Sequence, residues 1–275
     1  MKILKLVVVA LLVNVMAVSA AHADLVAHYR FTGGSLSDST GNGGVLTGYA
    51  VDSTNTPTVS GSGGVFGGGY ATFDGQNLFN TTFFPVTGNE DRTLSLFIRT
   101  NADNSGTGGG NTRFFAGWGS PNFVDRNRFD LGFQADSNSQ LRNEYNNGFT
   151  NSNATTSLNT GDWVHVAVVW EGASRTATFY ANQFAYGSAT LPQNLATGNG
   201  AVQVGLTIGG DTRAAGVLTG ASTITPNRFF TGDISDVRVY NRALTAAEIA
   251  AIPEPSTALM LVAGLAGLAV TRRRN

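Results

Sequence analysis

The sequence predicts an all-β fold, a sandwich of two antiparallel sheets, and two observations lead to it. Apolar and polar residues alternate with a period of two in many short stretches, which clusters of Gly, Asn and Ser separate. The composition agrees, because 35 of the 275 residues are glycine and only 13% are charged. Helical bundles need Ala, Glu, Lys and Leu in quantity, so this composition argues against a helical bundle. Since each antiparallel sheet buries one face against the other, a single sandwich is the simplest arrangement.

The expected strands can be followed along the chain. Stretches that alternate, or are rich in strand-forming residues, lie at 25–31, 94–99, 176–180, 203–208 and 233–240. The stretch 163–170 is apolar on both sides, which is typical of a central strand that is covered on both faces. We expect it to form a hairpin with 176–180.

One short helix is expected, at 245–251. Thr245 can cap the backbone N–H of Glu248 while the Glu248 side chain returns to Thr245, which is a capping box, and Pro253 ends the run. The glycine-rich stretches 61–69 and 101–111 are predicted to be surface loops.

The N-terminal residues 1–23 are typical of a secretory signal peptide. Lys2 and Lys5 precede an apolar stretch at 3–18, and Ala21-His22-Ala23 fits a cleavage site with small residues. We therefore expect the mature chain to begin at Asp24. An uncleaved membrane anchor is the alternative.

The C-terminal residues 253–275 combine three features in a fixed order. Pro253-Glu254-Pro255 comes first, an apolar stretch follows at 258–270, and three arginines stand near the end. This order resembles the PEP-CTERM sorting signal of exopolysaccharide-producing bacteria. The resemblance implies a Gram-negative source and an exosortase-type membrane protease that recognises Pro253, Glu254 and Pro255. It also implies a short transmembrane segment, transient contact of the tail with the inner membrane, and transfer toward the cell exterior. A simple tail anchor is the alternative, although the apolar stretch is shorter than the roughly 20 residues of a full span.

The two end segments leave one domain at 24–252, and its charge limits its partners. It holds 12 Arg against 17 acidic residues, a net charge of −5, and no lysine. A mildly acidic, lysine-free domain does not suit the phosphate backbone, so we expect no nucleic-acid partner. The chain has no cysteine and three histidines, which excludes disulfides and makes transition-metal chemistry a weak expectation.

Several motifs of the central domain together resemble the concanavalin A-like sandwich, in the branch of laminin G-like (LamG) jelly rolls. The resemblance covers nearly all of the domain and implies a jelly roll closed by a short helix. One departure is Asn182-Gln183, where the family usually has Asn-Gly, and another is the long loop 211–228. The fold hosts lectins, adhesion modules and glycanases, so it predicts function only weakly. The motifs are Leu25-Val26-Ala27-His28-Tyr29-Arg30-Phe31, the loop 36–43, Tyr70-Ala71-Thr72-Phe73-Asp74-Gly75, Gly161-Asp162-Trp163-Val164-His165-Val166-Ala167-Val168 and the closing stretch 230–244.

A structural Ca²⁺ is one further implication of the resemblance. In the family a cation often ties the N-terminal loop to the final strand, and the matching positions are Asp38, Asn42 and Asp236. Oxygen ligands of this kind suit calcium. The alternative is that Asp38 and Asn42 form a turn and that Asp236 pairs with an arginine.

Catalysis is not expected. Glycan hydrolysis needs two carboxylates across a cleft, and the Glu-x-Asp-x-x-Glu pattern of catalytic relatives is absent. Glu90, Glu144 and Glu171 are isolated from one another along the chain, and Gly-x-Ser-x-Gly is also absent. The mature chain keeps His28 and His165, and His165 is expected to have a packing role.

Sugar binding would use an aromatic ring that covers the apolar face of a sugar. Trp118 is the first candidate because Gly117 and Gly119 flank it, and Tyr145 is the second. The alternative is that Trp118 fills the core, as we expect of Trp170.

Together these observations predict a non-catalytic, exported β-sandwich of the bacterial cell surface or extracellular matrix, with polysaccharide as the candidate ligand. Two alternatives stay open. One is a structural matrix protein without a discrete ligand, and the other is a glycan-active hydrolase.

Overall fold

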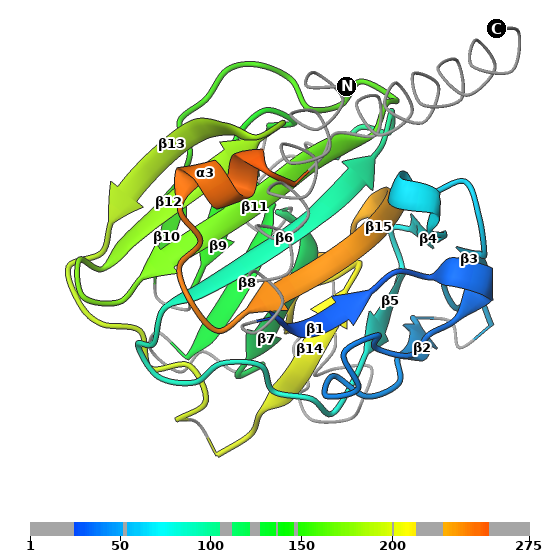
Figure 1. Cartoon of the computed structure of the whole chain (residues 1–275), viewed down its shortest axis with the longest axis horizontal. Helices are drawn as coiled ribbons and strands as arrows, with labels where there is room; N and C mark the ends of the chain where they lie inside the picture. The colour runs from blue at the N-terminus through cyan, green and yellow to red at the C-terminus, as the bar shows by residue number, and fades with distance from the viewer. Residues whose placement is uncertain are drawn as a thin grey trace, which may run out of the picture.

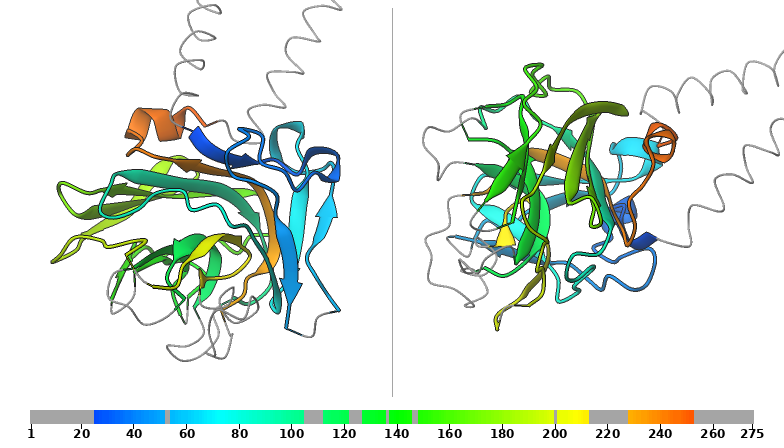
Figure 2. Two further views of the ribbon diagram at one scale, coloured as in Figure 1. Left: turned by 90° about the horizontal axis from the view of Figure 1, so that it is seen from below. Right: turned by 90° about the vertical axis from the view of Figure 1, so that its left-hand side faces the viewer.

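The computed structural model describes residues 25–51, 54–104, 112–121, 127–135, 137–145, 148–199, 201–212 and 228–252. They form two antiparallel sheets, which Figures 1 and 2 show as stacked layers, and one short α-helix, which confirms the predicted sandwich. Within this described part of the chain no helix is long and apolar enough to cross a membrane. The expected signal peptide, sorting motif and apolar stretch 258–270 lie outside the described residues.

The first sheet has eight strands, and β11, β6 and β15 occupy its middle. Seven of the strands follow in the order β13-β12-β11-β6-β15-β4-β3, and β1 pairs separately with β15. Their bounds are β1 Leu25–Tyr29, β3 Thr58–Ser60, β4 Tyr70–Asp74, β6 Arg92–Arg99, β11 Val164–Glu171, β12 Thr176–Ala181, β13 Phe184–Thr190 and β15 Thr231–Tyr240.

The second sheet has seven strands in the order β10-β9-β8-β7-β14-β5-β2. Their bounds are β2 Thr47–Ala50, β5 Asn77–Asn80, β7 Arg113–Gly119, β8 Arg128–Phe133, β9 Leu141–Glu144, β10 Phe149–Asn151 and β14 Val204–Ile208. Two 3₁₀ turns, η1 (Thr32–Gly34) and η2 (Val65–Gly67), precede β2 and β4 respectively. The stretch 61–69, expected as a surface loop, thus contains an ordered turn, and the side chain of Val65 is buried.

The main core lies between the two sheets and follows the predicted alternation. In β6 the side chains of Leu94, Leu96 and Ile98 belong to this core, while Phe97 belongs to a second apolar cluster on the outer face of the first sheet. The helix α3 (Ala246–Ala250) covers that outer face, as Figure 2 shows. Because both faces of the sheet are covered there, β11 is apolar on both sides, as the sequence predicted.

The start of α3 confirms the expected capping box. The Thr245 hydroxyl accepts a hydrogen bond from the Glu248 backbone, and the Glu248 carboxylate accepts one from the Thr245 backbone. The guanidinium of Arg242 also binds Glu248 through both of its terminal nitrogens. These interactions fix the start of α3, and Ile249 packs the helix against the outer face of the first sheet.

The Asn182-Gln183 turn between β12 and β13 has both residues at positive φ, 45° and 73°. Glycine is favoured at such positions because an L side chain is strained there. Here the Gln183 side chain donates a hydrogen bond to the carbonyl of Ile252 at 2.8 Å. Gln183 therefore ties the turn to the end of the domain, a contact that glycine could not make.

Candidate functional site

Asp38 organises the loop that follows β1. Its Oδ2 accepts hydrogen bonds from the backbone N–H groups of Asn42 and Gly43, both at 2.8 Å, and from the Thr40 hydroxyl. Its Oδ1 accepts one from the backbone of His28. Burial raises the pKa of Asp38, but these hydrogen bonds outweigh it and hold that pKa below its ordinary value.

Asp236 lies at a bulge in β15, with φ of +53°. Its Oδ1 is 2.6 Å from Nε2 of His28, and its Oδ2 is 2.7 Å from Nη2 of Arg238. Because His28 contacts Asp38 through its backbone and Asp236 through its ring, it links the N-terminal loop to the final strand.

The contacts of these three residues disfavour a calcium site. Both oxygens of Asp38 accept hydrogen bonds, Oδ1 of Asp236 lies 2.6 Å from Nε2 of His28, and Oδ2 of Asp236 makes an ion pair with Arg238 at 2.7 Å. Asn42 is exposed and contributes its backbone N–H rather than its side chain to the loop. Within the described ranges no group of three or more His, Cys, Asp or Glu side chains could hold a metal ion. This arrangement favours the alternative, in which Asp38 and Asn42 form a turn and Asp236 pairs with an arginine.

Neither of the two predicted sugar-binding rings is accessible. Trp118 is fully buried in the core, where its ring packs 5.1 Å from that of Phe129. Tyr145 is also buried, and its hydroxyl donates a hydrogen bond to the Phe149 carbonyl at 3.1 Å. The expectation that glycan contacts these two faces is therefore corrected, because a buried ring cannot cover a sugar.

The glycines around Trp118 have a different role from the one predicted. Along β7 they face away from the core, while the indole faces into it. A methyl group on Gly117 would overlap the carboxylate of Asp130, and one on Gly119 would overlap the backbone of Arg128. The two glycines therefore allow β8 to approach closely and do not expose the indole.

A network of buried charges lies on the outer face of the second sheet. Arg128 contacts Glu144, and it lies 3.3 Å from both Asp130 and Asp211. Arg228 lies 2.8 Å from Glu144 and 3.4 Å from Asp211. Burial raises the pKa of Asp130 to about 7, although the positive charge of Arg128 opposes the rise.

This network brings together carboxylates that are far apart in the sequence. Asp130 on β8 stands opposite Glu144 on β9, so Glu144 is not isolated in the fold. Both carboxylates are buried and bound by arginines. Their arrangement joins β8 and β9 to Asp211, which follows β14, and to Arg228, which precedes β15.

His165 has the packing role that the sequence predicted. Its Nε2 is 2.8 Å from the hydroxyl of Ser95, and both residues are about 1% exposed. Burial lowers the pKa of His165 to about 3, so the ring is neutral. A substrate has no access to this buried pair.

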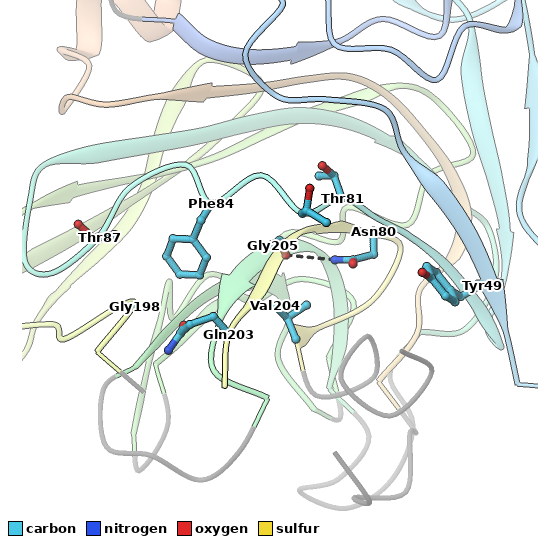
Figure 3. A pocket seen from close by; sticks show the side chains of 10 residues that line it. Tyr49, Asn80, Thr81, Phe84, Thr87, Gly198, Gln203, Val204 and Gly205 are labelled. Atoms are coloured by element: carbon cyan, nitrogen blue, oxygen red, sulfur yellow. Dashed lines mark hydrogen bonds between the residues drawn. The ribbon is translucent and has the colours of Figure 1, made fainter. Parts of the chain in front are cut away.

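A pocket of about 550 Å³ opens on the outer face of the second sheet, where β2, β5 and β14 lie side by side. Figure 3 shows the rings of Tyr49 and Phe84 at opposite ends of it. Its volume lies within the usual range of small-molecule sites. The other lining residues are Asn80, Thr81, Thr82, Thr87, Gly198, Gln203, Val204 and Gly205.

Strand pairing and side-chain hydrogen bonds form the floor of the pocket. Asn80 at the end of β5 pairs with both β2 and β14, and its amide N–H donates to the carbonyls of Gly205 and Leu206, each at 3.3 Å. A side chain at Gly205 would overlap the carbonyl of Thr81. Glycine is therefore required where β14 passes beneath the chain that leaves β5.

The loop between β5 and β6, which carries Phe84 and Thr87, is held from beneath. The guanidinium of Arg92 is fully buried and donates hydrogen bonds to four loop carbonyls at 2.8–3.3 Å. The indole N–H of Trp118 donates to one of the same carbonyls, that of Val86, at 2.8 Å. Trp118 thus supports the pocket loop from the core. The four acceptors of Arg92 are Val86, Thr87, Gly88 and Glu90.

The sequence interpretation missed this pocket. Its residues come from β2, from β5 and the loop after it, and from β14 and the loop before it, which become neighbours only through the order of strands in the sheet. The available signal was an aromatic residue within a polar, uncharged stretch, as at Tyr49 and Phe84.

The fold defines the class of protein. Its two stacked antiparallel sheets form a β-sandwich of the jelly-roll type. Residues 66–250 match the family model of the concanavalin A-like lectin/glucanases superfamily, and the chain belongs to that superfamily. Residues 251–274 match the PEP-CTERM protein-sorting motif, which supports export toward the cell surface.

Solved structures show the same fold. Domain 4 of AbnA, an extracellular GH43 arabinanase from Geobacillus stearothermophilus in complex with arabinotriose, is similar with a TM-score of 0.60. The identity is 22%, over 82% of this chain and 97% of that domain. The CBM40 of the Ruminococcus gnavus IT-sialidase has a TM-score of 0.51 at 14% identity, over 66% of this chain and 95% of that one. The binding domain of Paraclostridial Mosquitocidal Protein 1 has a TM-score of 0.56 at 13% identity, over 82% of this chain and 51% of that one. No curated protein sequence matches the chain significantly.

Proposed function

We propose that the protein is a non-catalytic, exported module of the bacterial cell surface or extracellular matrix that binds polysaccharide. The observation that carries the proposal is the pocket between Tyr49 and Phe84. Aromatic faces cover the apolar face of a sugar ring, and amide and hydroxyl side chains bind its hydroxyl groups. Asn80, Gln203 and the exposed hydroxyls of Thr82 and Thr87 provide those groups around the two rings.

The likeness to AbnA domain 4 supports a glycan ligand, since that domain is in complex with arabinotriose. The surroundings of the other polar clusters favour a binding role over catalysis. Asp130 and Glu144 are bound by arginines, and His165 is enclosed with Ser95. Neither cluster lines the described pocket.

The binding proposal is tested on a glycan array with wild-type protein and the variants Tyr49→Ala and Phe84→Ala. Loss of an aromatic face should weaken binding about tenfold, since such anchors contribute more than about 1 kcal/mol. Phe184→Ala is the matched control, because Phe184 is 75% exposed and lies outside the pocket. A flat array with folded wild-type protein would contradict the proposal and favour a structural matrix protein.

The route out of the cell forms a separate part of the proposal. We infer that a Gram-negative cell removes residues 1–23 and that an exosortase then acts at Pro253-Glu254-Pro255. The match at 251–274 supports the second step. Intact-mass analysis of secreted protein should give a chain that starts at Asp24 and lacks the tail. In a strain without the exosortase the tail should stay attached and the protein should remain with the inner membrane. Secretion of tail-free protein in both strains would contradict this route.

A further inference from the structure

The lining of the pocket is uncharged. Two aromatic rings, two amides, three hydroxyls, one valine and two glycines form the described wall, and none of these ten residues is acidic or basic. A carboxylate that enters such a site loses hydration, and the loss is costly unless a cation or several N–H donors replace the water. The described wall offers no cation.

The arginines on the same face of the sheet already have partners of opposite charge. Arg128 is fully buried among Asp130, Glu144 and Asp211, and Arg228 binds Glu144 and Asp211. Beneath the pocket loop, the guanidinium of Arg92 is directed at backbone carbonyls. Their positive charges therefore face carboxylates and carbonyls of the protein and are not directed at a sugar carboxylate in the pocket.

The wall instead matches a neutral sugar. Hydroxyl and amide groups both donate and accept hydrogen bonds, as sugar hydroxyls do. The amide N–H of Asn80 is held by backbone carbonyls, so its amide plane is fixed at the floor. The rings of Tyr49 and Phe84 at the two ends suit the C–H faces of successive sugars along a chain.

We propose that the pocket selects an uncharged polysaccharide, built of neutral hexose or pentose units, over chains that carry uronic or sialic acid. This inference rests on the proposed function, because it specifies the ligand class of the same site. A neutral chain keeps its hydroxyl contacts and loses no ionic hydration on entry. An acidic chain that is otherwise identical loses that hydration without compensation.

The test uses mature wild-type protein and an array that holds neutral and acidic polysaccharides in equal number. The strongest neutral binder that carries free primary hydroxyls, a hexose or pentofuranose oligosaccharide, is then oxidised at those hydroxyls to the uronic acid form, and both forms are titrated by calorimetry. We expect the oxidised form to bind at least tenfold more weakly. If acidic chains give the strongest signals, or if both forms bind equally, the inference is overturned while polysaccharide binding stands. If no glycan on the array binds, the proposed function itself fails.

A charge-addition variant assigns the selectivity to this pocket. Thr87 is exposed at the rim, and Thr87→Lys places a cation beside the wall. We expect this change to strengthen binding of the oxidised form roughly fivefold, as an attraction between partly solvated charges permits. Phe184→Lys adds the same charge outside the pocket and should change nothing. Equal effects of the two variants would overturn the assignment.

Discussion

Replacing Arg92 by lysine should destabilise the protein and loosen the loop that carries Phe84. The planar guanidinium of Arg92 donates to four carbonyl groups of that loop at once, at 2.8–3.3 Å. The ammonium group of lysine keeps the charge, but it has fewer N–H donors and all of them are on one nitrogen. It therefore cannot reproduce the planar, divergent donors of a guanidinium. We expect it to leave at least two of the four carbonyls without a partner.

The magnitude follows from the hydrogen bonds that a lysine cannot make. The carbonyl of Val86 keeps the indole N–H of Trp118 as a donor, and the hydrogen bonds to Thr87, Gly88 and Glu90 are partly buried. A carbonyl that loses such a bond costs about 1 kcal/mol, so two of them should lower the free energy of unfolding by about 2 kcal/mol. For a domain of this size that decrease corresponds to a fall in melting temperature of roughly 4–8 °C. Binding at the pocket should weaken as well, because Phe84 and Thr87 lie on the same loop.

Urea unfolding followed by circular dichroism measures the first effect, and calorimetric titration with a bound glycan measures the second. Arg242→Lys is the matched control, since Arg242 makes an ion pair with Glu248 that is partly exposed to solvent. Its effect should be about 1 kcal/mol or less. If the free energy of unfolding of Arg92→Lys is within about 0.5 kcal/mol of the wild-type value, the hydrogen bonds from Arg92 to the four carbonyls do not hold the loop.

Three further predictions concern the cluster around Asp236 and the pocket floor. Burial raises the pKa of Asp236, but the hydrogen bond from His28 and the charge of Arg238 hold it below its ordinary value. Its contribution to stability is therefore present above about pH 4 and lost as the pH falls through the folded-state pKa. Asp236→Asn should flatten the decrease in stability below about pH 4 in urea unfolding, and an unchanged acid slope would argue against this. Because the contacts of the cluster disfavour calcium, we expect the same melting temperature in EDTA and in CaCl₂, whereas bound calcium at 100 times its Kd would add about 2.7 kcal/mol. Gly205→Ala should cost about 1–3 kcal/mol and abolish binding, because the added methyl overlaps the Thr81 carbonyl; full binding by this variant would rule out the assigned floor.

Much of the fold could be predicted because its central strands are long and strongly patterned. The run 163–170 is apolar on both sides, and β11 indeed lies between β6 and β12, with the core on one face and the cluster beneath α3 on the other. The capping box at Thr245 was visible because its spacing is local. Short strands such as β2 and β5 were not anticipated, since Asn, Gly and Thr in four-residue stretches resemble loops.

The binding residues were harder to predict for a physical reason. Periodicity indicates that a strand exists, but not which strands become neighbours. The pocket depends on β2, β5 and β14 lying side by side. The prediction that Trp118 is an accessible, sugar-binding ring was wrong because glycines beside a tryptophan can either expose its ring or allow a neighbouring strand to approach. Here they allow the close approach of Asp130 and Arg128 rather than exposure of the ring.

The central claim is that a glycan binds between Tyr49 and Phe84, and an NMR titration of ¹⁵N-labelled protein tests it most directly. With the neutral oligosaccharide that gives the strongest array signal, we predict the largest shifts at the amides of Tyr49, Asn80, Phe84 and Gln203. The loop around Asp38 should change little. Shifts centred on that loop, or on the outer face of the first sheet, would place the ligand elsewhere and contradict the account.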